Sequence, residues 1–177
     1  MTENRLTDDL PGFDQPLALL RACHEKILAH CDLLEKLLTR MDTSGPDDEA
    51  RKAAERINRY FSTSAGLHHR DEEEDLFPRL NRQSLKIAEL VYGLKKEHEE
   101  LESLWKTLAP ELQRLPGETF SEDFSRAAGN FCSLYREHIE RENMEFLPIV
   151  ASSLSQQQLT EIGESMAERR GVPYSAR

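Results

Sequence analysis

Residues 68–80 read HHRDEEEDLFPRL, and residues 138–150 read HIERENMEFLPIV. Each segment places a histidine four residues before a glutamate and contains, near its end, an apolar residue followed by proline. The histidines, glutamates and prolines of the two segments match at one constant offset (138−68 = 142−72 = 148−78). This offset, named the segment offset below, indicates that the chain contains two related halves.

A further histidine precedes each segment. His24 lies in the segment HEKIL, and His98 lies in the similar segment HEEL. The order is therefore His24, His68 and Glu72 in the first half, and His98, His138 and Glu142 in the second. The two halves of a bundle built in this way would place these side chains opposite one another.

Apolar residues recur at spacings of three and four along almost the whole chain, which is the period of helices with one buried face. The sequence predicts long helices through residues 17–41, from Pro46 to Pro78, over about residues 84–109 with Pro110 at the end, and from Thr119, which forms a capping-box pattern with Glu122. A short fifth helix is expected to start at Ser155. The predicted fold class is all-α: an up-down-up-down four-helix bundle with a short C-terminal extra helix.

One domain is expected. Residues 1–14 are assigned to a flexible N-terminal tail, residues 15–150 to the four-helix bundle, and residues 151–177 to the C-terminal helix and tail. The length of 177 residues suits a single hydrophobic core.

Composition excludes several classes of protein. The net charge is −10 and charged residues make up 32% of the chain, with no basic stripe that could track phosphates, so no nucleic-acid partner is expected. No apolar run is long enough to cross a bilayer, and no membrane partner is expected. Cys23 and Cys31 are too far apart on one helix to form a disulfide. We expect a reduced, cytoplasmic protein.

The spacing of histidine and glutamate favours a metal centre. A histidine and a glutamate four residues apart project from the same face of a helix and can reach one ion. Four imidazoles and two carboxylates suit two iron ions, with bridging carboxylates, an oxo or hydroxo bridge and an open position for a small molecule. A structural zinc site usually includes thiolates, although zinc or another divalent ion could substitute. The expected metal ligands are His24, His68, Glu72, His98, His138 and Glu142.

The simpler alternative is a buried polar network without metal, since histidine and glutamate on one helix are more often solvated or hydrogen-bonded than ligating. It is less favoured because the six residues fall on the inward faces of all four helices. Tyr135 lies three residues before His138 and could hydrogen-bond near the ions, or simply pack in the core. His30 and His69 are expected on the surface, the acidic run 71–75 is expected to be mostly a solvated face, and Cys23 is expected in the core or at its boundary.

With these elements, residues 15–150 resemble the hemerythrin-like (HHE cation-binding) family. The resemblance implies a non-haem di-iron centre held by the same six residues, with Glu72 and Glu142 bridging. Oxygen-carrying hemerythrins have two histidines four apart on the third helix, whereas here Glu102 follows His98 at that distance and Leu94 precedes it. The chain is thus more similar to the four-histidine, two-glutamate branch, which is associated with responses to nitric oxide and oxidative stress and with iron delivery to damaged iron–sulfur centres.

Three functions of different classes remain open. The first is a binding or sensing protein whose di-iron site captures oxygen, nitric oxide or peroxide, or which holds iron. The second is an enzyme, such as a di-iron peroxidase, a nitric-oxide reductase or an iron donor, which would need an external redox partner. The third is a metal-free helical interaction module. A ferritin-like protein is disfavoured, because that class uses Glu-x-x-His pairs and none of the six histidines has a glutamate three residues before it.

Overall fold

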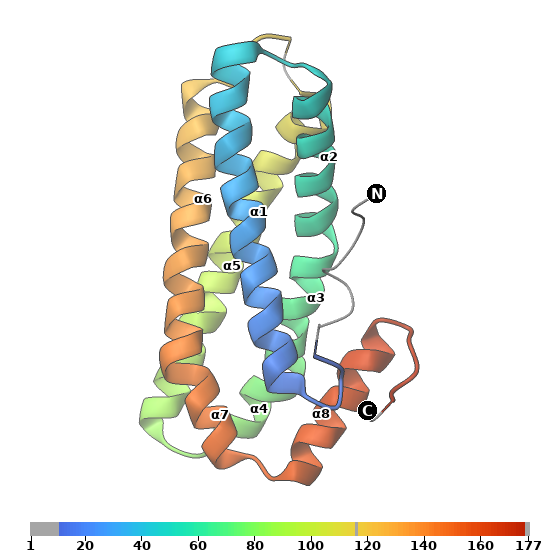
Figure 1. The fold of residues 1–177 in the computed structure, drawn as a ribbon. Helices are drawn as coiled ribbons and strands as arrows, with labels where there is room; N and C mark the ends of the chain where they lie inside the picture. Colours follow the sequence, from blue (N-terminus) through green and yellow to red (C-terminus); the bar gives the residue numbers. More distant parts are fainter. Residues whose placement is uncertain (1–10, 116, 176–177) are drawn as a thin grey trace.

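The computed structural model describes residues 11–115 and 117–175, and this part of the chain is helical with no strand. Its first seven α-helices and two π-helices follow one another in four columns. Figure 1 shows long helices side by side, which confirms the all-helical bundle predicted from the sequence. The first column is α1 (Pro16–Ser44) and the third is α5 (Leu85–Arg114). The second and fourth columns are each composed of several helical segments.

The second column begins with α2 (Asp48–Ser62) and, after a break at Thr63, continues as α3 (Ser64–Arg70). It then becomes a π-helix, η1 (Asp71–Leu76), followed by the single turn α4 (Phe77–Leu80). The fourth column repeats this order with α6 (Glu122–Arg141), the π-helix η2 (Glu142–Phe146) and α7 (Leu147–Ser153). The last helix, α8 (Gln156–Arg169), packs across the lower end of the bundle against α1 and η1 (Figure 1).

The two π-helices explain how the chain accommodates its repeated prolines. The amide of Phe77 bonds to the carbonyl of Glu72, and the amide of Leu147 bonds to the carbonyl of Glu142, so both bonds span five residues. Proline lacks an amide hydrogen and its ring collides with the carbonyl four residues earlier in a regular α-helix. The wider turn before Pro78 and before Pro148 removes that collision, so both columns continue past their prolines. Single π turns of this kind often occur at functional sites.

Two helix boundaries differ from the prediction. The third column continues to Arg114 with Pro110 inside the helix, because Pro110 lies on the exposed face, where water can solvate the carbonyl that its ring leaves unpaired. The fourth column begins at Glu122, capped by Ser121, whose hydroxyl accepts a bond of 3.1 Å from the amide of Phe124. The predicted cap, Thr119, instead donates its hydroxyl to Asp42. The capping box at Ser155 is present as predicted, since the side chain of Gln158 accepts a bond from the Ser155 amide.

Residues 1–10 of the expected flexible tail lie outside the described part of the chain. Phe13, which belongs to the same expected tail, packs against the apolar cluster at the lower end of the bundle. Gly163 on α8 approaches it so closely that a Cβ atom at this position would overlap the Phe13 carbonyl oxygen. The glycine therefore lets the chain before α1 lie directly on α8.

The apolar core consists of two clusters. The upper cluster contains Ile27, Phe61, Leu101 and Phe131, and the lower cluster contains Leu20, Leu76, Leu94 and Phe146. On each column the predicted metal ligands lie between a residue of one cluster and a residue of the other, as His24 lies between Leu20 and Ile27. The polar side chains thus form a layer enclosed by hydrophobic packing above and below. Among the described residues, no helix is both long and apolar enough to span a membrane.

Candidate metal centre

The six side chains expected to bind metal converge in this layer, and each is at most 3% exposed. They form two groups that could each hold an ion, with all ligand atoms within 4.8 Å of one another. His24 and His68 form the first group, which we name the first position, and His98 and His138 form the second group, the second position. Glu72 and Glu142 belong to both groups.

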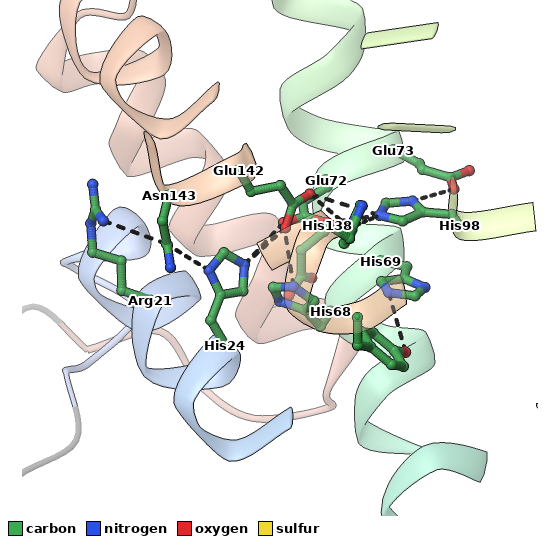
Figure 2. A network of polar contacts seen from close by, with 12 residues as sticks. Arg21, His24, His68, His69, Glu72, Glu73, His98, His138, Glu142 and Asn143 are labelled. Carbon is green, nitrogen blue, oxygen red and sulfur yellow. Dashed lines mark hydrogen bonds and ion pairs between the residues drawn. The ribbon is translucent and has the colours of Figure 1, made fainter. Parts of the chain in front are cut away.

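Each carboxylate presents one oxygen atom to each position. Glu72 places Oε1 3.3 Å from His68 Nε2 and Oε2 3.3 Å from His98 Nε2. Glu142 places Oε2 3.1 Å from His24 Nε2 and Oε1 3.1 Å from His138 Nε2 (Figure 2). This is the arrangement that carboxylates adopt when they bridge two ions, and each ion would have two imidazole nitrogens and two carboxylate oxygens.

Most inward-facing atoms of this layer have no hydrogen-bond partner among the described residues; the exceptions are Nε2 of His98 and Nε2 of His138, which lie 3.0 Å apart. The atoms without a partner include Nε2 of His24 and His68 and all four carboxylate oxygens of Glu72 and Glu142. The short distances between nitrogen and oxygen are ion-pair contacts without hydrogen-bond geometry. Leaving several buried polar atoms unpaired is costly, and the cost disappears if these atoms coordinate cations. The donor set therefore fits bound metal.

Three of the four imidazoles are oriented from behind by a partner on Nδ1. His24 bonds to the amide oxygen of Asn143 at 2.8 Å, His98 to the carboxylate of Glu73 at 2.8 Å, and His138 to the carboxylate of Glu97 at 2.7 Å. Partners of this kind fix the ring so that Nε2 faces the ion, and they raise its basicity. The metal-ligand spacing did not predict these three partners. Two of them could have been found from the segment offset, because it relates Glu73 to Asn143 as it relates Glu72 to Glu142.

The buried imidazoles and carboxylates of this layer strongly influence one another's pKa values. Burial opposes protonation of His24, but the carboxylates of Glu142 and Glu72 outweigh it and raise the pKa of His24 to about 10. Burial dominates at His68 and lowers its pKa to about 4. For Glu142, burial favours the neutral acid, yet the surrounding imidazoles hold its pKa well below the usual value. The pKa of Glu72 is lowered as well, so both glutamates are carboxylates, which is the form that binds metal.

The expectation that His69 lies on the surface was wrong. Its ring stacks on that of His98, with centroids 3.9 Å apart and planes 11° apart, and its Nε2 lies 3.5 Å from the hydroxyl of Tyr135. A metal ion lies in the plane of the imidazole that binds it, so two stacked, nearly parallel rings cannot share one ion. His69 therefore covers the second position without joining its ligands. Tyr135 is buried beside it, with a pKa raised well above the usual value by burial.

His30 is also buried and not on the surface. Its Nδ1 bonds to the carbonyl of Lys26, and its ring stacks on Tyr60 with centroids 3.8 Å apart. The pattern of the first helix did not anticipate this aromatic neighbour, which comes from α2. Cys23 is half-buried, in agreement with the expected boundary position, and burial raises the pKa of its thiol to about 11.

The acidic run is only partly solvated, so this prediction needs correction. Asp71 is fully buried and accepts hydrogen bonds from Arg169 at 2.5 Å and from Arg170 at 2.6 Å, while Asp75 binds Arg169 at 3.0 Å. These arginines come from the end of α8, which the spacing of the run could not reveal. The C-terminal helix is thereby fastened to the π-helix that carries Glu72.

A cleft of about 780 Å³ runs from the surface to the second position. It lies where the break at Thr63 separates α2 from α3, and Gly66 and Trp105 form part of its lining. The half-buried His69 also belongs to its lining, as does His98, which is 3% exposed. Small molecules therefore have a route to this side of the centre.

Fold and site together define a class: an all-helical bundle protein with a buried cluster of histidine and glutamate suited to cations. The comparison with known families is more specific, since the hemerythrin HHE cation-binding domain matches residues 15–150. The chain belongs to this family, as the resemblance in the sequence implied. It is also 32% identical over 160 residues to an uncharacterized protein of Haemophilus influenzae, and this match covers 90% of this chain and 92% of the relative.

Proposed function

We propose that the protein is a non-haem di-iron-binding member of its family that binds or senses oxygen, nitric oxide or peroxide, or handles iron in a stress response. One observation carries the proposal. Glu72 and Glu142 each direct one oxygen to each of two histidine pairs, and these oxygens have no hydrogen-bond partner among the described residues. Two cations satisfy this arrangement and one cation does not.

The donor set favours iron. Imidazole and carboxylate ligands together suit iron, whereas a structural zinc site is closed by four ligands, often thiolates. Each ion would receive two histidine and two glutamate donor atoms from the chain, fewer than the roughly six that iron commonly takes. Bound iron would supply exchangeable positions for a small ligand and one-electron redox chemistry. Zinc or another divalent ion can substitute in the same donor set.

The residues around the ions support a small ligand. Apolar clusters above and below the layer exclude bulk water. The cleft leads to His69, whose ring and the neighbouring Tyr135 hydroxyl offer polar hydrogens beside the second position. Molecules of two or three atoms suit this access better than large substrates, because His98, the candidate ligand in the cleft lining, is only 3% exposed.

The alternative of a metal-free interaction module fits the structure less well, because it leaves the inward-facing oxygens of Glu72 and Glu142 buried without partners among the described residues. We further propose a cytoplasmic location, in keeping with its three free cysteines. A redox partner would be needed for turnover as a peroxidase or nitric-oxide reductase. Neither a nucleic acid nor a membrane is proposed as a partner of a chain with a net charge of −10.

Anaerobic loading with ferrous iron tests the proposal. We expect about two irons per chain and, after oxidation, an absorption band typical of bridged ferric ions that azide or nitric oxide perturbs. His68→Ala and His138→Ala should lower the iron content, whereas His69→Ala, which changes the adjacent histidine, should retain both ions. Saturation at one metal per chain, with a spectrum insensitive to azide and nitric oxide, would contradict the di-iron function.

A further inference from the structure

The two halves of the chain differ in the residues that contact the Nδ1 side of the candidate ligand histidines. The segment offset relates Glu73 to Asn143, and Glu97 corresponds to Cys23, because each directly precedes the matching histidine of its half. Glu73 bonds to His98 and Asn143 bonds to His24, so each residue that follows a bridging glutamate orients a histidine of the other half. The ligands repeat between the halves, but the groups that support them do not.

Both imidazoles of the second position bond to carboxylates. Glu73 Oε1 lies 2.8 Å from His98 Nδ1, and Glu97 Oε2 lies 2.7 Å from His138 Nδ1. A carboxylate on Nδ1 draws the proton toward itself and makes Nε2 a stronger donor to the metal. Arg141 holds the other oxygen of Glu97 at 2.6 Å, which fixes this carboxylate in place.

The first position has no such carboxylate. His24 bonds to the neutral amide of Asn143, and Nδ1 of His68 is buried with no hydrogen-bond partner among the described residues. Cys23 occupies the place that Glu97 has in the other half, so this place offers no carboxylate to an imidazole. The two imidazoles of this position are therefore weaker donors, and the ring of His68 is less firmly oriented.

The charged side chains near the two positions also favour cation binding at the second position. Behind the second position, Arg141 offsets the negative charge of Glu97. The negative charge of Glu73, which bonds to His98, remains in excess. Near the first position, Arg169 and Arg170 offset Asp71 and Asp75, and Arg70 offsets Glu74, which also binds Arg169, so these charges cancel. Arg21, which contacts Asn143, adds a positive charge on this side. A divalent cation is therefore stabilised more at the second position than at the first position.

We infer that the two metal positions are unequal: the position between His98 and His138 holds its ion tightly, and the position between His24 and His68 releases its ion first. This inference rests on the proposed di-iron function and extends it. A chain of this kind can give up one iron while it keeps the other. The retained ion would be bound by His98, which lines the cleft, so a small ligand could reach it from there.

Timed removal of iron tests the inequality. The protein is saturated with ferrous iron without oxygen, its iron content is measured, and it is then mixed rapidly with an excess of a ferrous chelator. We expect two release phases of equal amplitude, with rates that differ by about 10-fold or more, because partners on Nδ1 change metal affinity by about 10–100-fold.

Two variants show which position gives rise to which release phase, one by accelerating the slow phase and the other by slowing the fast phase. Glu97→Gln keeps the shape of the side chain and removes its charge, and should accelerate only the slow phase by about 10-fold or more. Asn143→Asp gives the first position a carboxylate, which Arg21 can stabilise since its Nη1 lies 3.4 Å from Asn143 Oδ1. This variant should slow only the fast phase. Glu100→Gln, an equal change of charge at an exposed residue of α5 outside the cleft, should alter neither phase.

Failure of the inference can be distinguished from failure of the proposed function. Two irons that leave in a single phase would preserve the di-iron centre and overturn the inequality. Acceleration of the fast phase by Glu97→Gln, or no effect of Asn143→Asp on it, would also overturn the assignment, and the second variant decides alone if the first does not fold. Saturation at one iron would contradict the proposed function itself.

Discussion

Single atoms behind the imidazoles distinguish the two candidate metal positions, which share the same ligand types. His98 and His138 bond to carboxylates, whereas His24 bonds to an amide and His68 has no Nδ1 partner among the described residues. Ligand identity is therefore a coarse guide to the properties of a metal centre, because the partner of each ligand also sets its donor strength.

Tyr135→Phe tests the contribution of the hydroxyl that contacts His69, a residue of the cleft lining. The ring packs between Phe61 and Phe131 and remains in the variant, so metal content should not change. The hydroxyl contacts His69 at 3.5 Å, a weak bond whose loss should change the free energy of unfolding by about 1 kcal/mol or less. Without this contact His69 turns more freely, and azide binding to the loaded protein should change in rate.

Tyr60→Phe is the matched control, because Tyr60 stacks on His30, whereas the Tyr135 hydroxyl contacts His69. Stopped-flow mixing with azide measures both variants. Equal azide rates in wild-type protein and Tyr135→Phe would show that Tyr135 serves only packing, which was the simpler interpretation of this residue.

The six candidate ligands illustrate what single positions reveal before a fold is known. Their spacing predicted that they meet, and the structure brings all six into one layer. His69 was misplaced because a helical wheel measures its angle from His68 and contains no information about which neighbour fills the space beside it. Here α5 supplies His98 at that angle, and the two rings stack.

At the scale of elements, α8 is fastened to η1 by buried charges. Asp71→Ala would leave Arg169, whose side chain is 7% exposed, without its buried partner. Removing one member of a buried ion pair typically costs about 3–5 kcal/mol, so we expect a large fall in the free energy of unfolding measured with urea. Iron content should fall as well, because η1 carries Glu72.

Glu74→Ala is the control for this prediction. Glu74 binds the same Arg169 at 3.1 Å, but it is exposed, and solvent screens such pairs. Its removal should have a much smaller effect than Asp71→Ala. A similar loss of stability in both variants would indicate that the general acidity of η1, and not the buried pairing, fastens α8.

The start of α2 has a predictable dependence on pH. Arg40 pairs with Asp47, and the Ala50 amide bonds to it, so the pKa of this carboxylate falls from its ordinary value of 3.8 to about 2. A depressed pKa in the folded state contributes stability above the ordinary pKa, and this contribution is lost as the pH falls from about 4 to about 2. The stability of the wild type relative to Asp47→Asn should therefore decline over this range in urea titrations. A constant difference between the two proteins would contradict the assignment.

The order of the helices could be predicted from the spacing of apolar residues, but the hydrogen-bond pattern of the backbone within them could not. The period shows which side chains face inward, and it does not report whether an amide bonds four or five residues back, so both π-helices were missed. The prolines at 78 and 148 were the only local sign of them. Pro110 was taken as a helix end because its tolerance depends on exposure, which only the packed bundle defines.

For the molecule as a whole, the candidate centre replaces a layer of apolar packing. Two hydrophobic clusters meet at six buried polar side chains, so the bundle is continuous only if this layer is stabilised. Bound cations neutralise Glu72 and Glu142 and satisfy the inward nitrogens at once. Metal binding and folding are therefore expected to be coupled.

Removal of metal should accordingly lower the stability of the entire bundle. A ligand that binds only the folded state at a free concentration about 100 times its Kd stabilises it by about 2.7 kcal/mol. For a chain of this length, that corresponds to a rise in Tm of about 5–10 °C per ion. Scanning calorimetry of chelator-treated protein, with and without added ferrous iron under anaerobic conditions, measures the shift. His68→Ala should show a smaller shift and Glu100→Gln the full shift. A Tm that does not respond to iron would mean that the apoprotein satisfies its buried carboxylates by itself, and the layer would then be structural.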